Sequence, residues 1–254
     1  MSVKQVLPEK TYQGSFIPND PRIYKVSRSK IDLYINCPRC FYLDRRLNIK
    51  RPSGPPFNIN SAVDKLLKSE FDVHRAQGTK HPIHDEYGVD AIPAPHDDLD
   101  KWRENFHGIQ YLHQPTNLLL FGAIDDLWVN SKGEYMVVDY KATAKKDPVI
   151  ELGHETWHDQ YRRQIEFYQW LLRQNGYKVS NTGYWVYCTG DPEKKSFNKK
   201  AEFRVHLISY EGNDSWVEDA VNSAYTCLIS DKIPPVSESC EYCSYLEKYL
   251  ALNS

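Results

Sequence analysis

The chain has 254 residues, of which 41% are apolar and 26% are charged. This composition is ordinary for a globular protein, and the length suits one large domain or a core domain with a smaller lobe. The net charge of −2 does not favour a protein that binds nucleic acid through an overall basic surface, although basic patches can be local.

Features of membrane and secreted proteins are missing from the sequence. No run of about 18 apolar residues is present, so we expect no membrane span. The first residues, Met-Ser-Val-Lys-Gln, lack the apolar stretch of a signal peptide, which favours a cytoplasmic protein. Candidate basic patches are Arg45-Arg46 with Lys50-Arg51, Arg162-Arg163, and Lys194-Lys195 with Lys199-Lys200; the last is interpreted as solvated surface.

The first part of the chain is predicted to be helical after an irregular N-terminal arm over residues 1–26. A helix is predicted over Ser27–Tyr42, because a serine cap precedes apolar residues at helical spacing. Residues 51–57, rich in proline, end this helical part. A second helix is predicted over Ser61–Phe71, and residues 77–98, rich in His, Pro, Gly and Asp, are predicted as a long loop.

The middle of the chain predicts a β-hairpin followed by a long helix. Leu118–Val129 is apolar and indicates a strand, residues 130–133 indicate a turn, and Glu134–Ala142 indicates a second strand. Trp157–Asn175 has the spacing of an amphipathic helix, with Gly176 as its C-cap.

The last third predicts strands over Thr182–Cys188 and Glu202–Tyr210 and a helix over Asp214–Ile229. The complete order favours an α/β fold, with a central mixed sheet flanked by helices. We expect one domain over residues 27–254.

Acidic residues end both strands of the predicted hairpin. Asp125 follows the apolar run 121–124, while Asp139 and Lys141 follow the run 136–138. Residues i and i+2 of a strand share a face, so Asp139 and Lys141 project together. Asp126, the neighbour of Asp125, points the other way and is interpreted as structural.

Two carboxylates that meet across a hairpin repel each other unless a cation lies between them. Oxygen ligands suit Mg²⁺ or Mn²⁺, which could polarise a phosphoryl oxygen and lower the pKa of a bound water. Lys141 could orient that water or stabilise developing charge. An Asp-x-Lys triplet arises by chance roughly once in a chain of this length; its position at the end of an apolar strand favours the functional interpretation.

Three motifs in order resemble the PD-(D/E)XK nuclease superfamily and its RecB-like branch. The segment 122–125 resembles the G-x-I-D strand, the segment 139–141 resembles the (D/E)-x-K motif, and the segment 164–168 resembles the Q-x-x-x-Y motif of the branch. The resemblance implies a restriction-endonuclease-like core and catalytic roles for Asp125, Asp139, Lys141, Gln164 and Tyr168. It also implies a metal site at Asp125, Asp139 and Tyr140.

Gln164 and Tyr168 are four residues apart, so both could reach the active site or the DNA backbone from one helix face. The alternative is that Tyr168 is a core residue and Gln164 a surface residue. The family places a metal-binding histidine on an early helix, but residues 60–71 contain none. Asp64 stands near the expected position, either as a carboxylate replacement for that ligand or as a solvated residue.

Two C-x₂-C pairs predict a metal centre formed from both ends of the chain: Cys37, Cys40, Cys240 and Cys243. Their spacing alone indicates zinc. The resemblance instead implies a 4Fe-4S cluster, as in the CRISPR-adaptation exonucleases and AddB-type helicase–nucleases, although the third late cysteine of that pattern is Tyr249 here. With Cys40 as the fourth ligand, we favour the iron–sulfur cluster over zinc. Cys188 and Cys227 have no partner at motif spacing and are interpreted as buried apolar residues.

Together these features predict a Mg²⁺- or Mn²⁺-dependent deoxyribonuclease, with exonuclease action on single-stranded or frayed DNA ends implied by the resemblance. One alternative is an adaptation or repair partner that cuts only within a complex. A zinc-stapled nucleic-acid-binding protein without catalysis and a metal-dependent ribonuclease also fit the sequence.

Overall fold

The computed structural model describes residues 7–8, 10–54, 58–194, 196 and 198–252. The described chain divides into two compact units. Unit 1 comprises residues 58–109 and 123–214, whereas unit 2 comprises three separate stretches: residues up to 54, residues 110–122 and residues from 215 onward. Among the described helices, none is both long and apolar enough for a membrane crossing.

Unit 1 is built on a five-stranded mixed sheet. Its strands, in spatial order, are β3 (Ile92–Pro93), β6 (Asp126–Val129), β7 (Tyr135–Ala144), β8 (Thr182–Gly190) and β9 (Phe203–Glu211). Strand β7 is antiparallel to β6 and parallel to β8, and β9 returns antiparallel to β8. The helices of this unit are α3 (Asn58–Gln77), α4 (Pro82–Glu86), α5 (Leu99–Trp102) and α6 (Thr156–Gln174).

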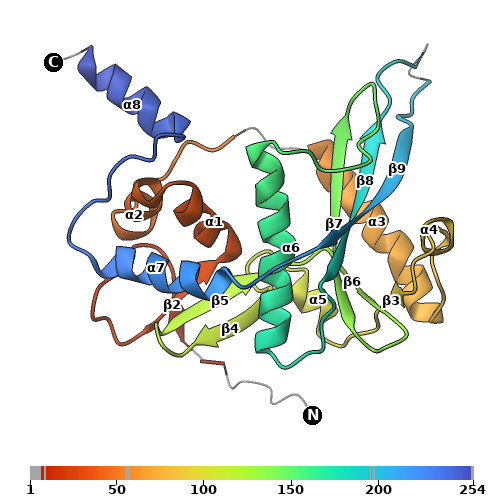
Figure 1. The fold of residues 1–254 in the computed structure, drawn as a ribbon, viewed down its shortest axis with the longest axis horizontal. Helices are drawn as coiled ribbons and strands as arrows, with labels where there is room; N and C mark the ends of the chain where they lie inside the picture. The colour runs from red at the N-terminus through yellow and green to blue at the C-terminus, as the bar shows by residue number, and fades with distance from the viewer. Residues whose placement is uncertain (1–6, 9, 55–57, 195, 197, 253–254) are drawn as a thin grey trace. The chain divides into compact units, whose positions relative to one another are not determined.

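The alternation of side chains along the strands gives this sheet two covered faces. Trp128, Val138 and Tyr140 lie on one face, where they pack against Phe71 of α3. The opposite face is covered by α6, which runs beside β7 and β8 (Figure 1). Gly183 allows this close approach, because a Cβ atom there would lie 2.6 Å from Cγ2 of Ile165.

Unit 2 contains a four-stranded sheet in the order β1 (Thr11–Tyr12), β2 (Ile23–Ser27), β5 (Leu118–Gly122) and β4 (Ile109–His113). The first residue of β4 belongs to unit 1. Strand β2 is parallel to both β1 and β5. The helices of unit 2 are α1 (Arg28–Asn36), α2 (Pro38–Arg46), α7 (Val217–Ile229) and α8 (Glu241–Ala251).

The mixed α/β fold flanked by helices is as predicted, and so are the hairpin β6–β7 and the helix α6. Gly176 has φ 79° and donates its N–H to the carbonyl of Arg173, as expected of a helix C-cap. Helix α3 is longer than predicted. Helix α8 and strand β4 had no counterpart in the sequence prediction.

Four predicted segments differ in the structure. Strands β1 and β2 lie within or across the end of the predicted irregular arm. The helix predicted over 27–42 is broken at Cys37, which is extended because proline at the next position disfavours helical backbone. The strand predicted over 118–129 is two strands in different sheets, interrupted at residues 123–125, and the predicted loop 77–98 contains α4 and β3.

Candidate active site and cysteine centre

Strand β7 carries Asp139 and Lys141 toward α6. Asp139 has no exposed surface and forms an ion pair with Lys141. The ammonium of Lys141 also donates to Oε1 of Gln164 at 3.2 Å and lies 4.4 Å from the centre of the Tyr161 ring. The expected i, i+2 projection is therefore present, and two residues of α6 fix where the lysine points.

Asp125 lies directly before β6 and reaches the same end of β7. Its Oδ2 accepts a hydrogen bond from the backbone N–H of Tyr140 at 3.0 Å. Burial raises the pKa of Asp139; Lys141 opposes this rise, whereas the neighbouring charge of Asp125 adds to it. Because Asp125 is bonded to the backbone of the residue that follows Asp139, the two carboxylates lie at the same end of β7, as the predicted cation site requires.

Helix α3 adds a third carboxylate and a second lysine. The ammonium of Lys68 is 2.9 Å from Oδ2 of Asp64 and 3.3 Å from Oδ1 of Asp125. Burial raises the pKa of Asp64, and the nearby Asp125 raises it further. Lys68 was not among the predicted site residues, although its position four residues after Asp64 could have indicated the pairing.

The donor set fits a hard divalent cation. Asp125 and Asp139 offer carboxylate oxygens, and Oδ1 of Asp139 is buried without a hydrogen-bond partner among the described residues. Asp64 and Asp125 both contact the ammonium of Lys68, which would compete with such an ion for these two carboxylates. The three carboxylates do not reach the close mutual spacing of the cysteines described below.

Tyr140 contributes to this site through its backbone rather than its side chain. Its hydroxyl points to the opposite face of the sheet and donates to Oδ2 of Asp126 at 2.6 Å. Asp126 has no exposed surface and also pairs with Arg75 and Arg103, so it is structural, as predicted. Arg103 further donates to the carbonyl of Asp125 at 3.0 Å and thereby fixes the start of β6.

Gln164 and Tyr168 lie together on α6, as their spacing predicts. The amide Nε2 of Gln164 is 3.5 Å from the hydroxyl of Tyr168, while its Oε1 accepts from Lys141. Tyr168 is 4% exposed, so it belongs to the core, and its hydroxyl contacts the amide of Gln164.

A cavity of about 470 Å³ opens over the carboxylates. Asp64 and Asp125 line it together with Lys141 and Tyr161, and Asn60 and Asn105 add amides. A phosphodiester in this cavity would meet carboxylates, an ammonium and neutral donors at once. That combination suits metal-assisted hydrolysis of a phosphate ester.

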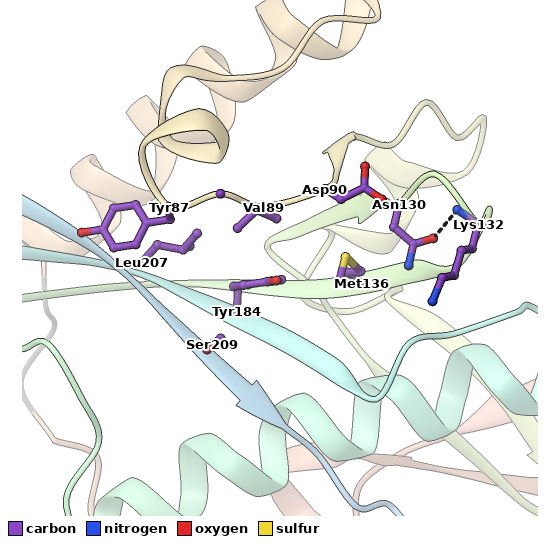
Figure 2. A pocket seen from close by; sticks show the side chains of 10 residues that line it. Tyr87, Val89, Asp90, Asn130, Lys132, Met136, Tyr184, Leu207 and Ser209 are labelled. Atoms are coloured by element: carbon purple, nitrogen blue, oxygen red, sulfur yellow. Dashed lines mark hydrogen bonds between the residues drawn. The ribbon is translucent and has the colours of Figure 1, made fainter.

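A separate cavity of about 360 Å³ lies on the face of the sheet opposite α6 (Figure 2). Tyr87, Met136, Tyr184 and Leu207 give it an apolar floor, and Lys132 stands at its rim. Asp90 is the one carboxylate among its lining residues, so this cavity does not share the acidic character of the candidate site.

The two cysteine pairs meet within unit 2. The Sγ atoms of Cys37, Cys40, Cys240 and Cys243 all lie within 4.8 Å of one another, and all four residues are buried. Measured separations are 3.8 Å between Cys37 and Cys243, 3.6 Å between Cys40 and Cys240, and 3.5 Å between Cys40 and Cys243. The predicted four-cysteine cluster is therefore present.

Cys37 is the thiol of this cluster that its surroundings favour as a thiolate, whereas burial raises the pKa of Cys40 and of Cys243. Cys37 is the N-cap of α2, and its sulfur accepts from the N–H of Cys40 at 3.4 Å. Although burial raises the pKa of Cys37, backbone hydrogen bonds lower it by more, so that the net shift is downward. Arg51 places its guanidinium 3.2 Å from the sulfur of Cys240 and over the Tyr242 ring. These donors would partly balance the charge of a metal–thiolate centre.

Cys188 and Cys227 lie outside this cluster, as expected. Cys188 packs in the apolar core of unit 1, and Cys227 is half-buried on α7.

Comparison with known proteins places the chain in a family. The model of the PD-(D/E)XK nuclease superfamily matches residues 58–247, about three quarters of the chain. The chain belongs to this superfamily. The matched part of this PD-(D/E)XK nuclease includes the carboxylate site, α6 and the second cysteine pair, whereas Cys37 and Cys40 precede it.

Among solved structures, the nuclease is similar to a protein from Eubacterium rectale described as a "Putative exonuclease". The two are 14% identical, the similarity covers 86% of each chain, and the TM-score is 0.42. No curated protein matches the sequence.

Proposed function

We propose that this nuclease is a divalent-metal-dependent deoxyribonuclease that acts at single-stranded or frayed DNA ends. The observation that carries the proposal is the fully buried Asp139 and the partly exposed Asp125 beside Lys141, on a hairpin within the part of the chain that the family model matches. A fully buried carboxylate next to a second one is costly to keep without a cation, which makes it a marker of function rather than of packing.

In this proposal Asp125 and Asp139 hold Mg²⁺ or Mn²⁺, with Asp64 as an additional ligand. The ion, when bound, supplies Lewis acidity toward the phosphate and lowers the pKa of water. Lys141 remains fixed by Asp139 and Gln164 and directs its ammonium at the charge that develops on the phosphate. Tyr161 limits the directions available to that ammonium and shields it from water on one side.

The test compares wild type with Asp139→Asn and Lys141→Met on end-labelled single- and double-stranded DNA, with Mg²⁺, Mn²⁺ or EDTA. Both variants should lose at least about 100-fold in cleavage rate, the size seen when a charge-stabilising group is removed. Asp100→Asn, an exposed carboxyl on α5, is the matched control and should cut normally. Cleavage that persists in EDTA or in Asp139→Asn would refute the assignment.

The same assay distinguishes this reaction from its rivals. A ribonuclease would cut labelled RNA and spare DNA of the same sequence. An adaptation or repair partner would bind DNA ends and cut them only with its partner proteins present. An exonuclease releases mononucleotides or short products from the first time point, whereas an endonuclease first shortens a circular or end-blocked strand.

For the cysteine centre we propose a single tetrahedral ion, with zinc as the metal. Four thiolates about 2.3 Å from one ion lie about 3.8 Å from each other. Three of the six separations, 3.5, 3.6 and 3.8 Å, are close to this value, and all six are below 4.8 Å. A four-iron cluster binds each cysteine through a different iron and needs sulfur atoms farther apart. The spacing therefore favours zinc over the cluster that the family resemblance implied.

Metal analysis of protein purified without oxygen, from cells supplied with iron, tests this assignment. We expect about one zinc per chain, no acid-labile sulfide and no broad visible absorption. Exchange into Co²⁺ should give the absorption bands of tetrahedral thiolate coordination. About four irons with four sulfides, and brown colour, would overturn the zinc assignment and leave the nuclease assignment untouched.

A further inference from the structure

A second cavity adjoins the carboxylate site in unit 1. Its volume is about 730 Å³, within the range of ligand-binding pockets. It lies where the parallel strands β7 and β8 end and where α3 and α6 begin, at the upper ends of these elements in Figure 1. The carboxyl ends of parallel strands are where open α/β sheets bind ligands.

Aromatic side chains dominate this cavity. Trp157 and Tyr161 come from successive turns of α6, with ring centres 5.4 Å apart and planes at 80°. Phe203 of β9 and Tyr187 of β8 complete the apolar lining. Trp157 is 37% exposed, although a tryptophan that served only packing would be more deeply buried.

A cation stands at the edge of the aromatic group. The ammonium of Lys145 lies 5.7 Å from the centre of the Trp157 ring. The segment that carries it is fixed by Arg204, whose guanidinium donates to the carbonyls of Lys145 at 2.9 Å and Lys146 at 2.7 Å. Lys145 can therefore offer charge to a phosphate while the rings offer flat apolar surface.

The cavity is continuous with the carboxylate site. Asn60, Ala142 and Tyr161 line both cavities. Tyr161 also touches the ammonium of Lys141 with its ring. A molecule in the aromatic cavity would therefore be separated from the proposed scissile phosphate by the side chain of Tyr161.

We propose that this cavity is a nucleobase-binding subsite, in which Trp157 stacks on an unpaired base, Tyr161, whose ring is nearly perpendicular to that of Trp157, contacts the edge of the base, and Lys145 contacts its backbone phosphate. Aromatic rings bind any base through its flat face, so the subsite tolerates different sequences. A base can enter only when it is neither paired nor stacked in a duplex, which selects single strands and frayed ends. The inference rests on the proposed nuclease function and names the substrate form that this site accepts.

The subsite is tested by binding rather than cleavage, in an Asp139→Asn background with EDTA present. Trp157→Ala should weaken binding of an eight-nucleotide oligothymidylate by about 5- to 100-fold, the range for loss of one stacked base. Trp157→Phe keeps a ring and should lose less than about threefold. Tyr87→Ala is the matched control, because Tyr87 is 38% exposed and lines the separate cavity of Figure 2.

Abasic substitutions locate the base in the subsite. One abasic nucleotide near the cleaved phosphate should weaken binding to the protein that retains Trp157. The same abasic nucleotide should cause no further loss of affinity in the Trp157→Ala variant. Losses that simply add at every position, or no measurable binding of single strands, would overturn the subsite. If Asp139-dependent DNA cleavage is found but the losses from the abasic nucleotide and from Trp157→Ala are independent, the subsite is refuted and the nuclease function stands. If the two losses are not additive but no cleavage is found, the nuclease function is refuted and the subsite stands.

Discussion

The carboxyl of Asp139 shows how one residue would set the conditions for the proposed metal binding. It is fully buried, and both burial and Asp125 raise its pKa against the opposing effect of Lys141. A raised pKa means that the folded protein holds this proton more tightly than the unfolded chain. Without metal, the stability contributed by the protonated form is present at acid pH and is lost as pH rises through the shifted pKa.

Because a proton and a cation compete for this carboxylate, we expect metal affinity to fall as the solution is acidified. Between pH 7.5 and pH 5.5, the dissociation constant for Mn²⁺ should increase by up to about tenfold per pH unit. Calorimetric titration at several pH values measures this, and Asp139→Asn should remove most of the dependence. An affinity that is constant across this interval would contradict a proton-competitive site at Asp139.

Lys68 gives a second prediction at the residue scale. Its ammonium lies between Asp64 and Asp125, so Lys68→Met leaves two carboxylates that repel each other. We expect a lower melting temperature without metal and a larger rise on adding Mn²⁺ than in wild type. Lys65→Met, an exposed position on the same helix, is the control for losing a lysine from α3. Equal metal responses in the two variants would show that Lys68 does not occupy the cation position.

The residues of the hairpin could be predicted because strand alternation fixes which of them share a face. Asp139 and Lys141 follow from that rule alone, and Asp126 follows from the same rule as the residue that points away. Lys68 and Arg51 could not be found in this way. Each reaches its partner from an element whose position depends on tertiary packing, and a single lysine or arginine is ordinarily a surface residue.

At the scale of elements, the contact between α6 and β8 determines the position of Gln164, the α6 residue that accepts a hydrogen bond from Lys141. Gly183→Ala would place a methyl group 2.6 Å from Cγ2 of Ile165 and 3.1 Å from the carbonyl of Val137. We expect destabilisation of about 1–3 kcal/mol, as for other overpacked cores, measured by urea unfolding. The displaced α6 should also weaken the bond from Lys141 to Gln164 and lower the cleavage rate.

Two variants separate overpacking from a general effect of alanine. Gly54→Ala adds a methyl that meets no atom within 4 Å and should be nearly neutral. The double variant Gly183→Ala with Ile165→Ala should be less destabilised than the sum of the single variants, because the clashing methyl is gone. Strict additivity would show that the methyl of Ile165 is not the obstacle.

Helices and strands in which apolar residues recur at a regular spacing were predictable, whereas the interruptions between these elements were less so. The spacing in α6 and the alternation in β7 indicate their types directly. The break at Cys37 has a local cause in Pro38, which the helix prediction underweighted. The interruption at residues 123–125 is marked in the sequence only by Gly122 and the two aspartates at 125 and 126, and it reflects the passage of the chain from one sheet to another.

At the scale of the whole molecule, the cysteine centre joins segments that lie about 200 residues apart in sequence. Stability that comes from a bound metal is lost when the metal is removed, because unfolded chains lack the preformed site. Treatment with a strong chelator, or Cys240→Ser, should therefore increase hydrogen exchange in α1, α2 and α8. Exchange in α6 and β7 of unit 1 should change far less.

Cys227→Ser is the control for this experiment, since Cys227 lies on α7 of the same unit but outside the four-sulfur cluster. It should leave exchange in α1, α2 and α8 near wild type. Uniform loss of protection in both units would contradict a local role for the centre, and unchanged protection in α1 and α2 would contradict any structural role.

The arrangement of unit 2 has a consequence for how the protein is made. Translation delivers residues in order, so the strands and helices of unit 1 are synthesised before Cys240 and Cys243. Unit 2 must wait with Cys37 and Cys40 already exposed to the cell, and these two thiols can meet oxidants or foreign metals during that interval. Loading of the proposed metal would therefore belong to the last stage of biosynthesis, and a released chain that ends at residue 239 should fold unit 1 and leave the first cysteine pair open to alkylation.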